Sequence, residues 1–296
     1  MSLLERIVEI SASGSCARPA SDAGDNEGGM FSSEIEGPVA VIGDLHGQVD
    51  QLRAVREKLR NLPDIGDRWI VFIGDLVDRG PDPRGGVELV LEMMDEFKKV
   101  TCVAGNHDFG MAAAMGLLDT PSFANWAERW VDHYDSETTF ASYGVPHGDM
   151  KGLISAVPEE HALLLMIMPW CVEHPRYLFV HAGLDPYMTY ESQVQALRRP
   201  DMSVSRPPWL CEPGFSDQGA PRDCVKTVVS GHVRFPEVQF RDRKILCDTT
   251  GGLSGELSCV LLPEMEVISS GIPRGVVPDK KSASEAVKMS WWKRFT

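Results

Sequence analysis

Five short segments of the chain carry the residue types that bind metal ions and phosphate. Each follows an apolar run and combines glycine with aspartate, histidine or asparagine. The segments are GDLHG (43–47), GDLVDRG (74–80), GNHD (105–108), VHAG (180–183) and SGH (230–232). Carboxylate oxygens, imidazole nitrogens and an asparagine carbonyl together suit Mn, Fe or Zn. One such segment would more often be a structural turn, but five in one chain predict a metal site.

The apolar runs before these segments have the length and composition of buried strands. PVAVIGD (38–44), RWIVFIGD (68–75) and KVTCVAGNH (99–107) alternate with helical patterns at 48–60 and 87–97. This order predicts a parallel sheet with helical layers. Ligands of an open α/β sheet bind beyond the carboxyl ends of its strands, so the polar segments should converge there. Glycine lets the backbone turn sharply and approach a metal or phosphate closely.

The remaining chain completes one domain around this sheet. Phe109 to Arg176 is predicted to be mostly helical and to cap the site, and Pro200 to Arg222 is predicted to be loop. Further strands are expected at 177–183, 226–232, 238–240, 244–248, 257–262 and 267–269. We therefore expect a disordered or loosely attached arm (1–36), a catalytic domain (37–270) that contains the helical insertion 109–176, and a C-terminal tail (271–296).

Bulk composition excludes several classes of protein. The net charge is −14, with 43 acidic against 29 basic residues, which argues against broad nucleic-acid binding. No run approaches the ~20 apolar residues of a transmembrane helix. Seven cysteines without a CxxC pair argue against a disulfide framework and a thiolate zinc site. The N-terminus lacks the pattern of a secretory signal, so a cytoplasmic location is expected.

Taken together, the five segments resemble the motif series of calcineurin-like metallophosphoesterases. The Asp-Arg-Gly ending of the second segment resembles the PPP protein phosphatases in particular. The resemblance covers residues 39–262. It implies an α/β fold, a four-layer αββα sandwich of mixed β-sheets, with the helical insertion near the site. It also implies two divalent metal ions, whose identity among Mn, Fe and Zn stays open.

The same resemblance implies a ligand for each metal position. Asp44 and His46 resemble ligands of the first metal, and Asp75 resembles a carboxylate that bridges both. Two cations that share a carboxylate can lower the pKa of a bound water and so supply a hydroxide nucleophile that attacks the phosphomonoester directly. The residues that resemble ligands of the second metal are Asn106, His181 and His232.

Further residues resemble the groups that act on the substrate. His107 resembles a general acid that protonates the leaving oxygen, and Asp78 resembles the carboxylate that orients it. Arg79 resembles an arginine that binds phosphate oxygens, and Asn106 is also expected to contact the substrate. A second phosphate-binding arginine is expected, for which Arg198 is the first candidate. The competing candidates are Arg199, Arg206 and Arg234.

Some positions depart from the typical PPP pattern. Asp108 stands where typical PPP enzymes have glutamate, and the fourth segment reads His-Ala-Gly in place of His-Gly-Gly. Asp248-Thr249-Thr250-Gly251-Gly252 replaces the Ser-Ala-Pro-Asn-Tyr segment of eukaryotic Ser/Thr phosphatases. These departures resemble the bacterial-type branch.

A narrower resemblance concerns the Rhizobiales-like phosphatases. It is carried by GNHDF (105–109), TTFASYGVPHG (138–148), AVPEEH (156–161), VHAGL (180–184) and VVSGH (228–232). That group implies phosphotyrosine-directed activity on phosphoprotein or phosphopeptide substrates, whereas composition and spacing alone do not indicate tyrosine preference.

Three functions remain open from the sequence. The first is a phosphoprotein phosphatase, which the intact His107, Asp78 and Arg79 favour. The second is a dinucleoside polyphosphate or RNA-cap pyrophosphohydrolase, because bacterial-type relatives include symmetric nucleotide hydrolases. The third is a non-catalytic scaffold on the same fold, which predicts lost ligands, although every expected ligand is present.

Overall fold

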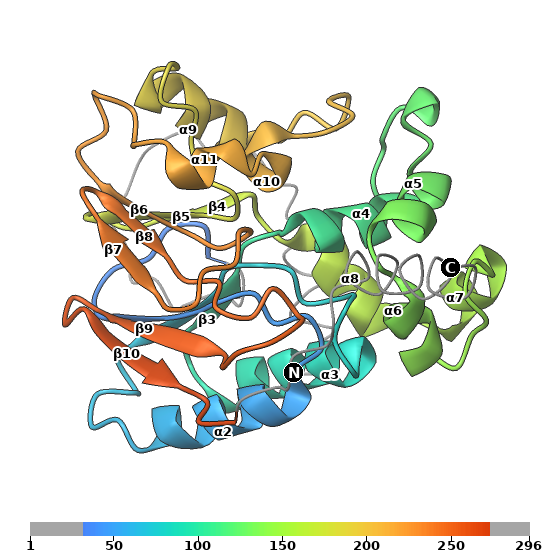
Figure 1. Ribbon diagram of the computed structural model, residues 1–296, viewed down its shortest axis with the longest axis horizontal. Coiled ribbons are helices and arrows are strands. Elements are labelled where there is room, and N and C mark those ends of the chain that lie inside the picture. The colour runs from blue at the N-terminus through green and yellow to red at the C-terminus, as the bar shows by residue number, and fades with distance from the viewer. Residues whose placement is uncertain (1–31, 273–296) are drawn as a thin grey trace, which may run out of the picture.

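The computed structural model describes residues 32–272. Predictions for the arm up to residue 31 and for the tail from residue 273 therefore lie outside the described residues. The described chain forms two five-stranded sheets that lie face to face between layers of helices (Figure 1). Within residues 32–272 no helix has the length and apolarity that a membrane span requires.

The first sheet has the strand order β10-β9-β1-β2-β3. β1 (Val39–Ile42) pairs in parallel with β2 (Trp69–Phe72), and β2 pairs in parallel with β3 (Val100–Cys102). β9 (Ser258–Leu262) adds to β1 in the antiparallel sense, and β10 (Glu266–Ser269) closes that edge. All five strands were predicted from the sequence, and the three parallel strands end where the first three polar segments begin.

The second sheet has the order β4-β5-β6-β8-β7. β5 (Tyr177–Val180), β6 (Thr227–Ser230) and β8 (Lys244–Leu246) are parallel neighbours, and β7 (Gln239–Arg241) forms the predicted hairpin with β8. β4 (Cys171–Glu173) was not predicted, because its residues continue the apolar run of the preceding helix. The helical insertion therefore ends before residue 171, earlier than the predicted boundary at residue 176.

Side-chain alternation along the strands separates two cores. Val39 and Val41 of β1 point into a core between the sheets, together with Phe179 and Val229 of the second sheet. Neighbouring β1 residues such as Ile42 point to the opposite face, where they meet the helices. Both faces of each sheet are thus covered, which explains the continuous apolar runs and confirms the predicted αββα sandwich.

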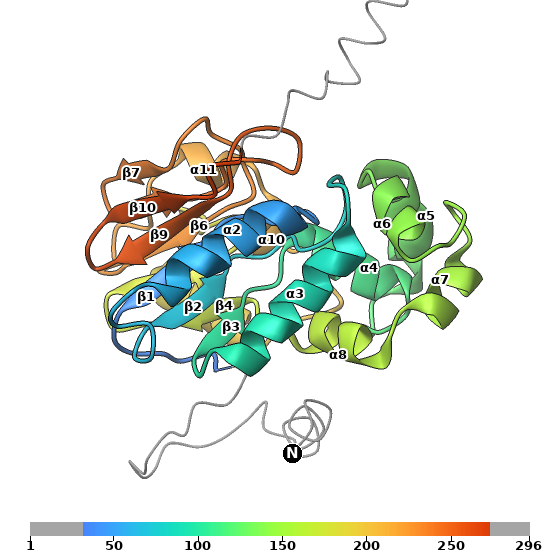
Figure 2. The same cartoon turned by 90° about the horizontal axis from the view of Figure 1, so that it is seen from below.

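Helices cover the outer face of each sheet (Figures 1 and 2). α2 (Val49–Arg60) and α3 (Pro83–Glu96) lie on the first sheet, and α9 (Tyr190–Arg198) lies on the second. The segment 200–222, predicted to be loop, also contains the one-turn helices α10 (Pro208–Cys211) and α11 (Gly214–Asp217). Proline suits the first turn of a helix, so Pro208 begins α10 rather than preventing it.

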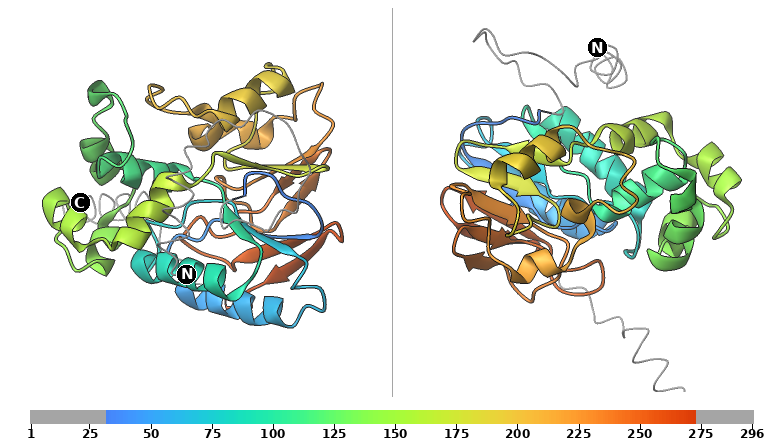
Figure 3. Two further views of the ribbon diagram at one scale, coloured as in Figure 1. Left: turned by 180° about the vertical axis from the view of Figure 1, so that it is seen from behind. Right: turned by 90° about the horizontal axis from the view of Figure 1, so that it is seen from above.

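The helical insertion forms a lobe beside the sandwich (Figure 3). Trp130 and Phe140, both fully buried, stack at its centre with ring centroids 5.3 Å apart. Its elements are α4 (Asn106–Ala114), η1 (Ser122–Ala124), α5 (Trp126–His133), α6 (Glu137–Ser142), α7 (Met150–Ala156) and α8 (Glu159–Ile167).

Residues just before β1 belong to the sandwich, unlike the predicted loose arm. The amide of Ile35 donates to the carbonyl of Glu173 at 2.8 Å, and the amide of Glu173 donates to Ser33 at 2.8 Å. Ile35 is 3% exposed and lies in the core between the sheets. The ordered domain therefore begins by residue 33 in place of residue 37.

The buried guanidinium of Arg68 joins β1 and β9 at one end of their pairing, where Val39 lies opposite Leu262. It donates to the carbonyls of Val39 and Leu262 at 3.1 and 3.2 Å and to the carboxylates of Asp64 and Glu264 at 2.6 and 2.8 Å. We expect Arg68→Met to lower the free energy of unfolding by about 1–3 kcal/mol, because buried acceptors lose their donor.

Urea unfolding followed by circular dichroism measures this loss. Arg53→Met is the matched control, since Arg53 pairs with the exposed Asp50 on the surface of α2. It should change stability by no more than about 0.5 kcal/mol. Equal losses in the two variants would contradict a special role for the buried arginine.

Candidate metal and phosphate site

The predicted polar segments meet at one edge of the sandwich. Five of the predicted site residues adopt left-handed backbone conformations there, with φ between 45° and 69°. Non-glycine residues in this region are strained, and such strain concentrates at functional sites. These residues are His46, Asp75, Asp78, Arg79 and His232.

Glycines allow the segments to approach one another closely. A Cβ atom on Gly105 would collide with the Asp75 carboxylate, and one on Gly231 would collide with the Asp44 carboxylate. The Asp108 carboxylate also joins two segments, because it accepts from the amides of Leu76 at 2.8 Å and Gly105 at 3.0 Å. Aspartate at this position, a departure from the PPP pattern, thus fixes the GNHD segment against the GDLVDRG segment.

One group of ligand atoms surrounds the side of Asp75 that faces the second sheet. His181 Nε2 lies 3.3 Å from Asp75 Oδ2 and 3.1 Å from Asn106 Oδ1. His232 Nδ1 lies 2.9 Å from the same Asn106 oxygen. Asp75, His181 and His232 form one set of residues spaced to hold a metal ion.

A second group shares Asp75 and includes residues of the first sheet. His46 Nε2 lies 3.5 Å from Asp75 Oδ2. His46, Asp75 and His107 form the other set spaced for a metal ion. Asp44 lies alongside: its Oδ2 accepts from the amide of His232 at 2.9 Å, while its Oδ1 is buried without a hydrogen-bond partner. Two candidate metal positions therefore share one carboxylate, that of Asp75.

Backbone carbonyls orient two of the imidazoles. His46 Nδ1 lies 2.7 Å from the carbonyl of Val77, and His181 Nδ1 lies 2.8 Å from that of Ile73. A carbonyl can only accept, so each Nδ1 carries a proton and each Nε2 is the nitrogen that faces the Asp75 carboxylate. Metal-binding histidines are commonly fixed in this manner by an outer hydrogen bond.

The carboxylates make this edge strongly attractive to cations. Burial opposes a charged His181, yet the adjacent Asp75 and Asp44 raise its pKa to about 10. Burial also opposes ionisation of Asp75, but the His181, His107 and His46 imidazoles hold its pKa well below the usual range. For Asp44, burial and the nearby Asp248 carboxylate raise the pKa well above that range.

These observations fit a site for divalent metals. Within residues 32–272, no lysine or arginine forms an ion pair with Asp44 or Asp75. Buried carboxylates without such partners are costly unless cations neutralise them. The donors are imidazole nitrogens, carboxylate oxygens and one amide oxygen, a set that suits Mn, Fe or Zn. The structure does not identify which of these metals binds.

His107 and Asp78 form a buried pair beside the first group. His107 Nδ1 lies 2.8 Å from Asp78 Oδ2, and the His107 ring is edge-on to that of His46 with centroids 4.7 Å apart. Burial raises the pKa of Asp78 to about 8 and lowers that of His107 to about 3. Both shifts disfavour isolated charges on the two groups, which contact each other through Nδ1 and Oδ2.

Arg79 lies at the same edge with unused donor capacity. Its Nη1 lies 3.2 Å from His46 Nε2 and 3.2 Å from the carbonyl of Gly251. Its Nε is buried, and within residues 32–272 it has no hydrogen-bond partner. An arginine beside a cation-binding edge, with a buried donor left unsatisfied, is arranged to receive an anion.

Arg198 is not brought to this edge. It lies on α9, where its guanidinium donates to both oxygens of Glu173 at 2.6 and 3.0 Å. Among the competing arginines, Arg206 donates to the carbonyl of Cys211 at 2.8 Å. The side chain of Arg234 passes over Gly251, the residue that Arg79 contacts.

Several residues of the site were not predicted from the sequence. Asp248 follows β8, is 1% exposed and accepts from the amides of Thr250 and Gly251 at 3.0 and 2.7 Å. Its other oxygen is buried without a partner. The apolar run KIL before Cys247-Asp248 carries the same strand-end signal as the five segments. Trp130 and Thr139, by contrast, have no sequence signal for their contacts with Asp78.

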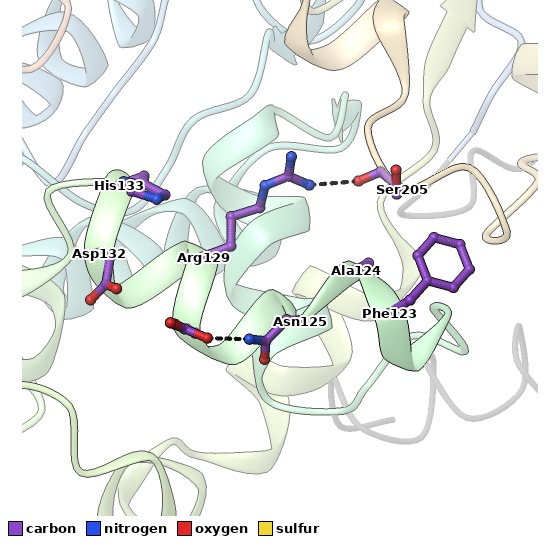
Figure 4. A pocket seen from close by; sticks show the side chains of 8 residues that line it. Phe123, Ala124, Asn125, Arg129, Asp132, His133 and Ser205 are labelled. Carbon is purple, nitrogen blue, oxygen red and sulfur yellow. Dashed lines mark hydrogen bonds between the residues drawn. The ribbon is translucent and has the colours of Figure 1, made fainter.

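A separate pocket of about 300 Å³ lies on the outer side of the helical insertion (Figure 4). Arg129 crosses it toward the carbonyl of Ser205, to which it donates at 3.0 Å. Phe123, 79% exposed, stands at the rim. The pocket lining includes the carboxylates of Glu128 and Asp132 beside Arg129 and His133. Its lining residues are Phe123, Ala124, Asn125, Glu128, Arg129, Asp132, His133 and Ser205.

Comparison with known proteins agrees with the geometry. The sequence profile of the calcineurin-like phosphoesterase family matches residues 37–248. Because this match spans most of the chain, the protein belongs to the calcineurin-like phosphoesterase family. It is therefore a phosphoesterase, and the paired ligand groups described above are its candidate dimetal site.

Curated relatives resemble the chain over most of its length. A symmetrical bis(5'-nucleosyl)-tetraphosphatase of Vibrio campbellii is 24% identical over 256 residues, which are 85% of this chain and 83% of the relative. The asymmetrical bis(5'-nucleosyl)-tetraphosphatase PrpE of Bacillus thuringiensis is 25% identical over 257 residues, 81% of this chain and 96% of the relative.

Among solved structures, a cold-active protein-tyrosine phosphatase of a psychrophilic Shewanella species matches with a TM-score of 0.53. The match has 18% sequence identity and covers 88% of this chain and 87% of that one. At this identity the likeness shows a shared fold alone.

Proposed function

We propose that this protein is a two-metal phosphohydrolase. His46 and Asp44 would hold one metal, His181, His232 and Asn106 would hold the other, and Asp75 would contact both. The observation that carries this proposal is the shared, buried Asp75 between two ligand groups. When bound, two such cations activate water for attack and neutralise phosphoryl charge.

The chain's own residues would orient the phosphate and move the proton. Arg79, half-buried beside His46, would donate to phosphate oxygens, and Asn106 would also contact the substrate. His107 would give its Nε2 proton to the leaving oxygen as the P–O bond breaks, while Asp78 holds Nδ1. In place of Arg198, we favour Arg234, whose side chain lies against Gly251 beside Arg79, as the second phosphate-binding arginine.

We propose dinucleoside polyphosphates as the first substrate class. Support comes from the two relatives named as bis(5'-nucleosyl)-tetraphosphatases, each matched over more than four-fifths of this chain. Such a reaction cleaves a phosphoanhydride, and its leaving group is a nucleotide.

A phosphomonoester, with phosphotyrosine foremost, is the second candidate. One specific observation favours it: the His107–Asp78 pair is complete and buried. The phenolate of tyrosine is a poor leaving group and needs a proton, whereas a nucleotide leaving from an anhydride needs less help.

A direct comparison of substrates tests the proposal. Turnover of diadenosine tetraphosphate, a phosphotyrosine peptide and a phosphoserine/phosphothreonine peptide would be measured with Mn²⁺, with Asp75→Asn protein as the background control. We expect kcat/KM for the dinucleotide to exceed the others by at least about tenfold, equivalent to ~1.4 kcal/mol of transition-state stabilisation. A phosphotyrosine preference would replace the first candidate by the second. Metal-loaded protein that turns over none of the three would favour the non-catalytic scaffold.

A further inference from the structure

Asp78 is held from the helical insertion as well as from its own loop. Trp130 Nε1, on α5, donates to Asp78 Oδ2 at 2.9 Å, the same oxygen that contacts His107. Thr139 Oγ1, on α6, donates to Asp78 Oδ1 at 2.6 Å and accepts from the Asp78 amide at 3.0 Å. Asp78, Trp130 and Thr139 are each 0% exposed. Every oxygen of this carboxylate is therefore fixed in position.

These contacts restrain both the carboxylate and a strained backbone. Asp78 has φ 69° and Arg79 has φ 59°, so the loop after β2 needs outside support. The amide of Arg79 also donates to the carbonyl of Asp135, between α5 and α6, at 3.1 Å. Four hydrogen bonds thus join one lobe to two consecutive residues, and the pair beside the metal ligands depends on elements 52 and 61 residues further along the chain.

We propose that Trp130 and Thr139 are positioning residues for the His107 general acid, so that the helical insertion completes the proton-donating group rather than only covering the substrate. This inference rests on the proposed function. In the imidazolium form of His107, Asp78 would accept the Nδ1–H and so aim the Nε2–H at the leaving oxygen; as the P–O bond breaks, that proton passes to the oxygen and His107 is left as the neutral Nδ1–H imidazole. Without Trp130 or Thr139 the carboxylate could rotate, and His107 would lose its orientation.

In a purely structural role, Trp130 and Thr139 would only satisfy the hydrogen-bonding capacity of the buried Asp78 carboxylate. The structural role and the positioning role predict different effects on the turnover of different substrates. Loss of fold or of metal slows all substrates alike. Loss of proton donation lowers the hydrolysis rate most for substrates with the poorest leaving groups. Phenyl phosphate has a poor leaving group and 2,4-dinitrophenyl phosphate a good one, so this pair separates the two roles.

The chain offers matched controls for both variants. Trp126 lies on the same helix as Trp130, and its indole N–H is buried without a hydrogen-bond partner. Thr138 adjoins Thr139, and its hydroxyl is also buried without a partner. Trp130→Phe is therefore compared with Trp126→Phe, and Thr139→Val with Thr138→Val. Thr139→Ser retains the hydroxyl and should restore the function.

With Mn²⁺ supplied, we expect Trp130→Phe and Thr139→Val to lower kcat on phenyl phosphate by about 10–100-fold, a part of the roughly 10²–10⁴-fold that a general acid contributes. On 2,4-dinitrophenyl phosphate the loss should be a few-fold at most, with metal content and KM unchanged. The controls and Thr139→Ser should behave as wild type. Equal losses on both esters, or equal losses in the controls, would overturn the proposal.

A measurement without turnover separates this inference from the proposed function. Long-range ¹⁵N spectra of EDTA-treated protein report which nitrogen of His107 carries the proton. We expect one Nδ1–H form in wild type and both controls, and a mixture of forms in Trp130→Phe and Thr139→Val. An unchanged spectrum in those two variants overturns the positioning role. If instead Asp78→Asn and wild type show the same leaving-group dependence, the general-acid role in the proposed function fails while the spectra still decide the positioning.

Discussion

Asp75→Asn should remove metal binding and activity together. Asp75 Oδ2 lies within 3.5 Å of both His46 Nε2 and His181 Nε2, so one substitution weakens both candidate metal positions. Removing an outer partner of a ligand typically costs 10–100-fold in metal affinity or activity, so loss of a shared ligand should cost more than about 100-fold. Metal analysis of the purified protein and kcat/KM with Mn²⁺ measure the two effects.

The fold should survive this substitution. The asparagine oxygen can still accept from the amide of His107, which donates to Asp75 Oδ1 at 3.0 Å. Asp95→Asn, an exposed aspartate on α3, is the control for loss of one negative charge and should keep full metal content and activity. If Asp75→Asn retained both metals and wild-type turnover, the shared carboxylate could not be the centre of the site.

The site edge was predictable because strand periodicity and ligand chemistry coincide in the sequence. A buried strand in this fold is a short apolar run, and the chain leaves the sheet at its carboxyl end. Asp44, Asp75 and Asn106 each follow such a run directly, so their convergence followed from topology alone. His181 and His232 follow the parallel strands of the second sheet in the same way.

What the sequence did not reveal depends on contacts between distant segments. Trp130 and Thr139 lie in ordinary amphipathic helices, and nothing local indicates that both contact Asp78. Arg198 was a candidate because a guanidinium suits phosphate. Its partner Glu173 lies on β4, and this strand was not predicted because its residues continue the apolar run of α8. Asp248 follows a strand, as the other carboxylates of the site do, but no histidine lies next to it in the sequence. The residue type alone therefore did not show whether Asp248 faces the site or belongs to a structural turn.

His107→Asn should separate proton donation from metal binding. The geometry allows His107 to act either as a metal ligand or as a general acid. It is grouped with His46 and Asp75 at metal-ligand spacing, and its Nδ1 also lies 2.8 Å from Asp78 Oδ2. As a general acid it should contribute about 10²–10⁴-fold to the turnover of esters with poor leaving groups. We therefore expect the variant to keep its metals and to lose that factor on phenyl phosphate, with a much smaller loss on 2,4-dinitrophenyl phosphate.

The control is His133→Asn, an exposed histidine at the end of α5, which should leave both rates unchanged. A His107→Asn protein that lost one metal would instead assign His107 to the first metal position. Its Nδ1 is already engaged by Asp78, so a metal would have to take Nε2, the atom that the proposed proton transfer requires. The two roles therefore exclude each other at one nitrogen, and metal content measured beside the leaving-group dependence decides between them.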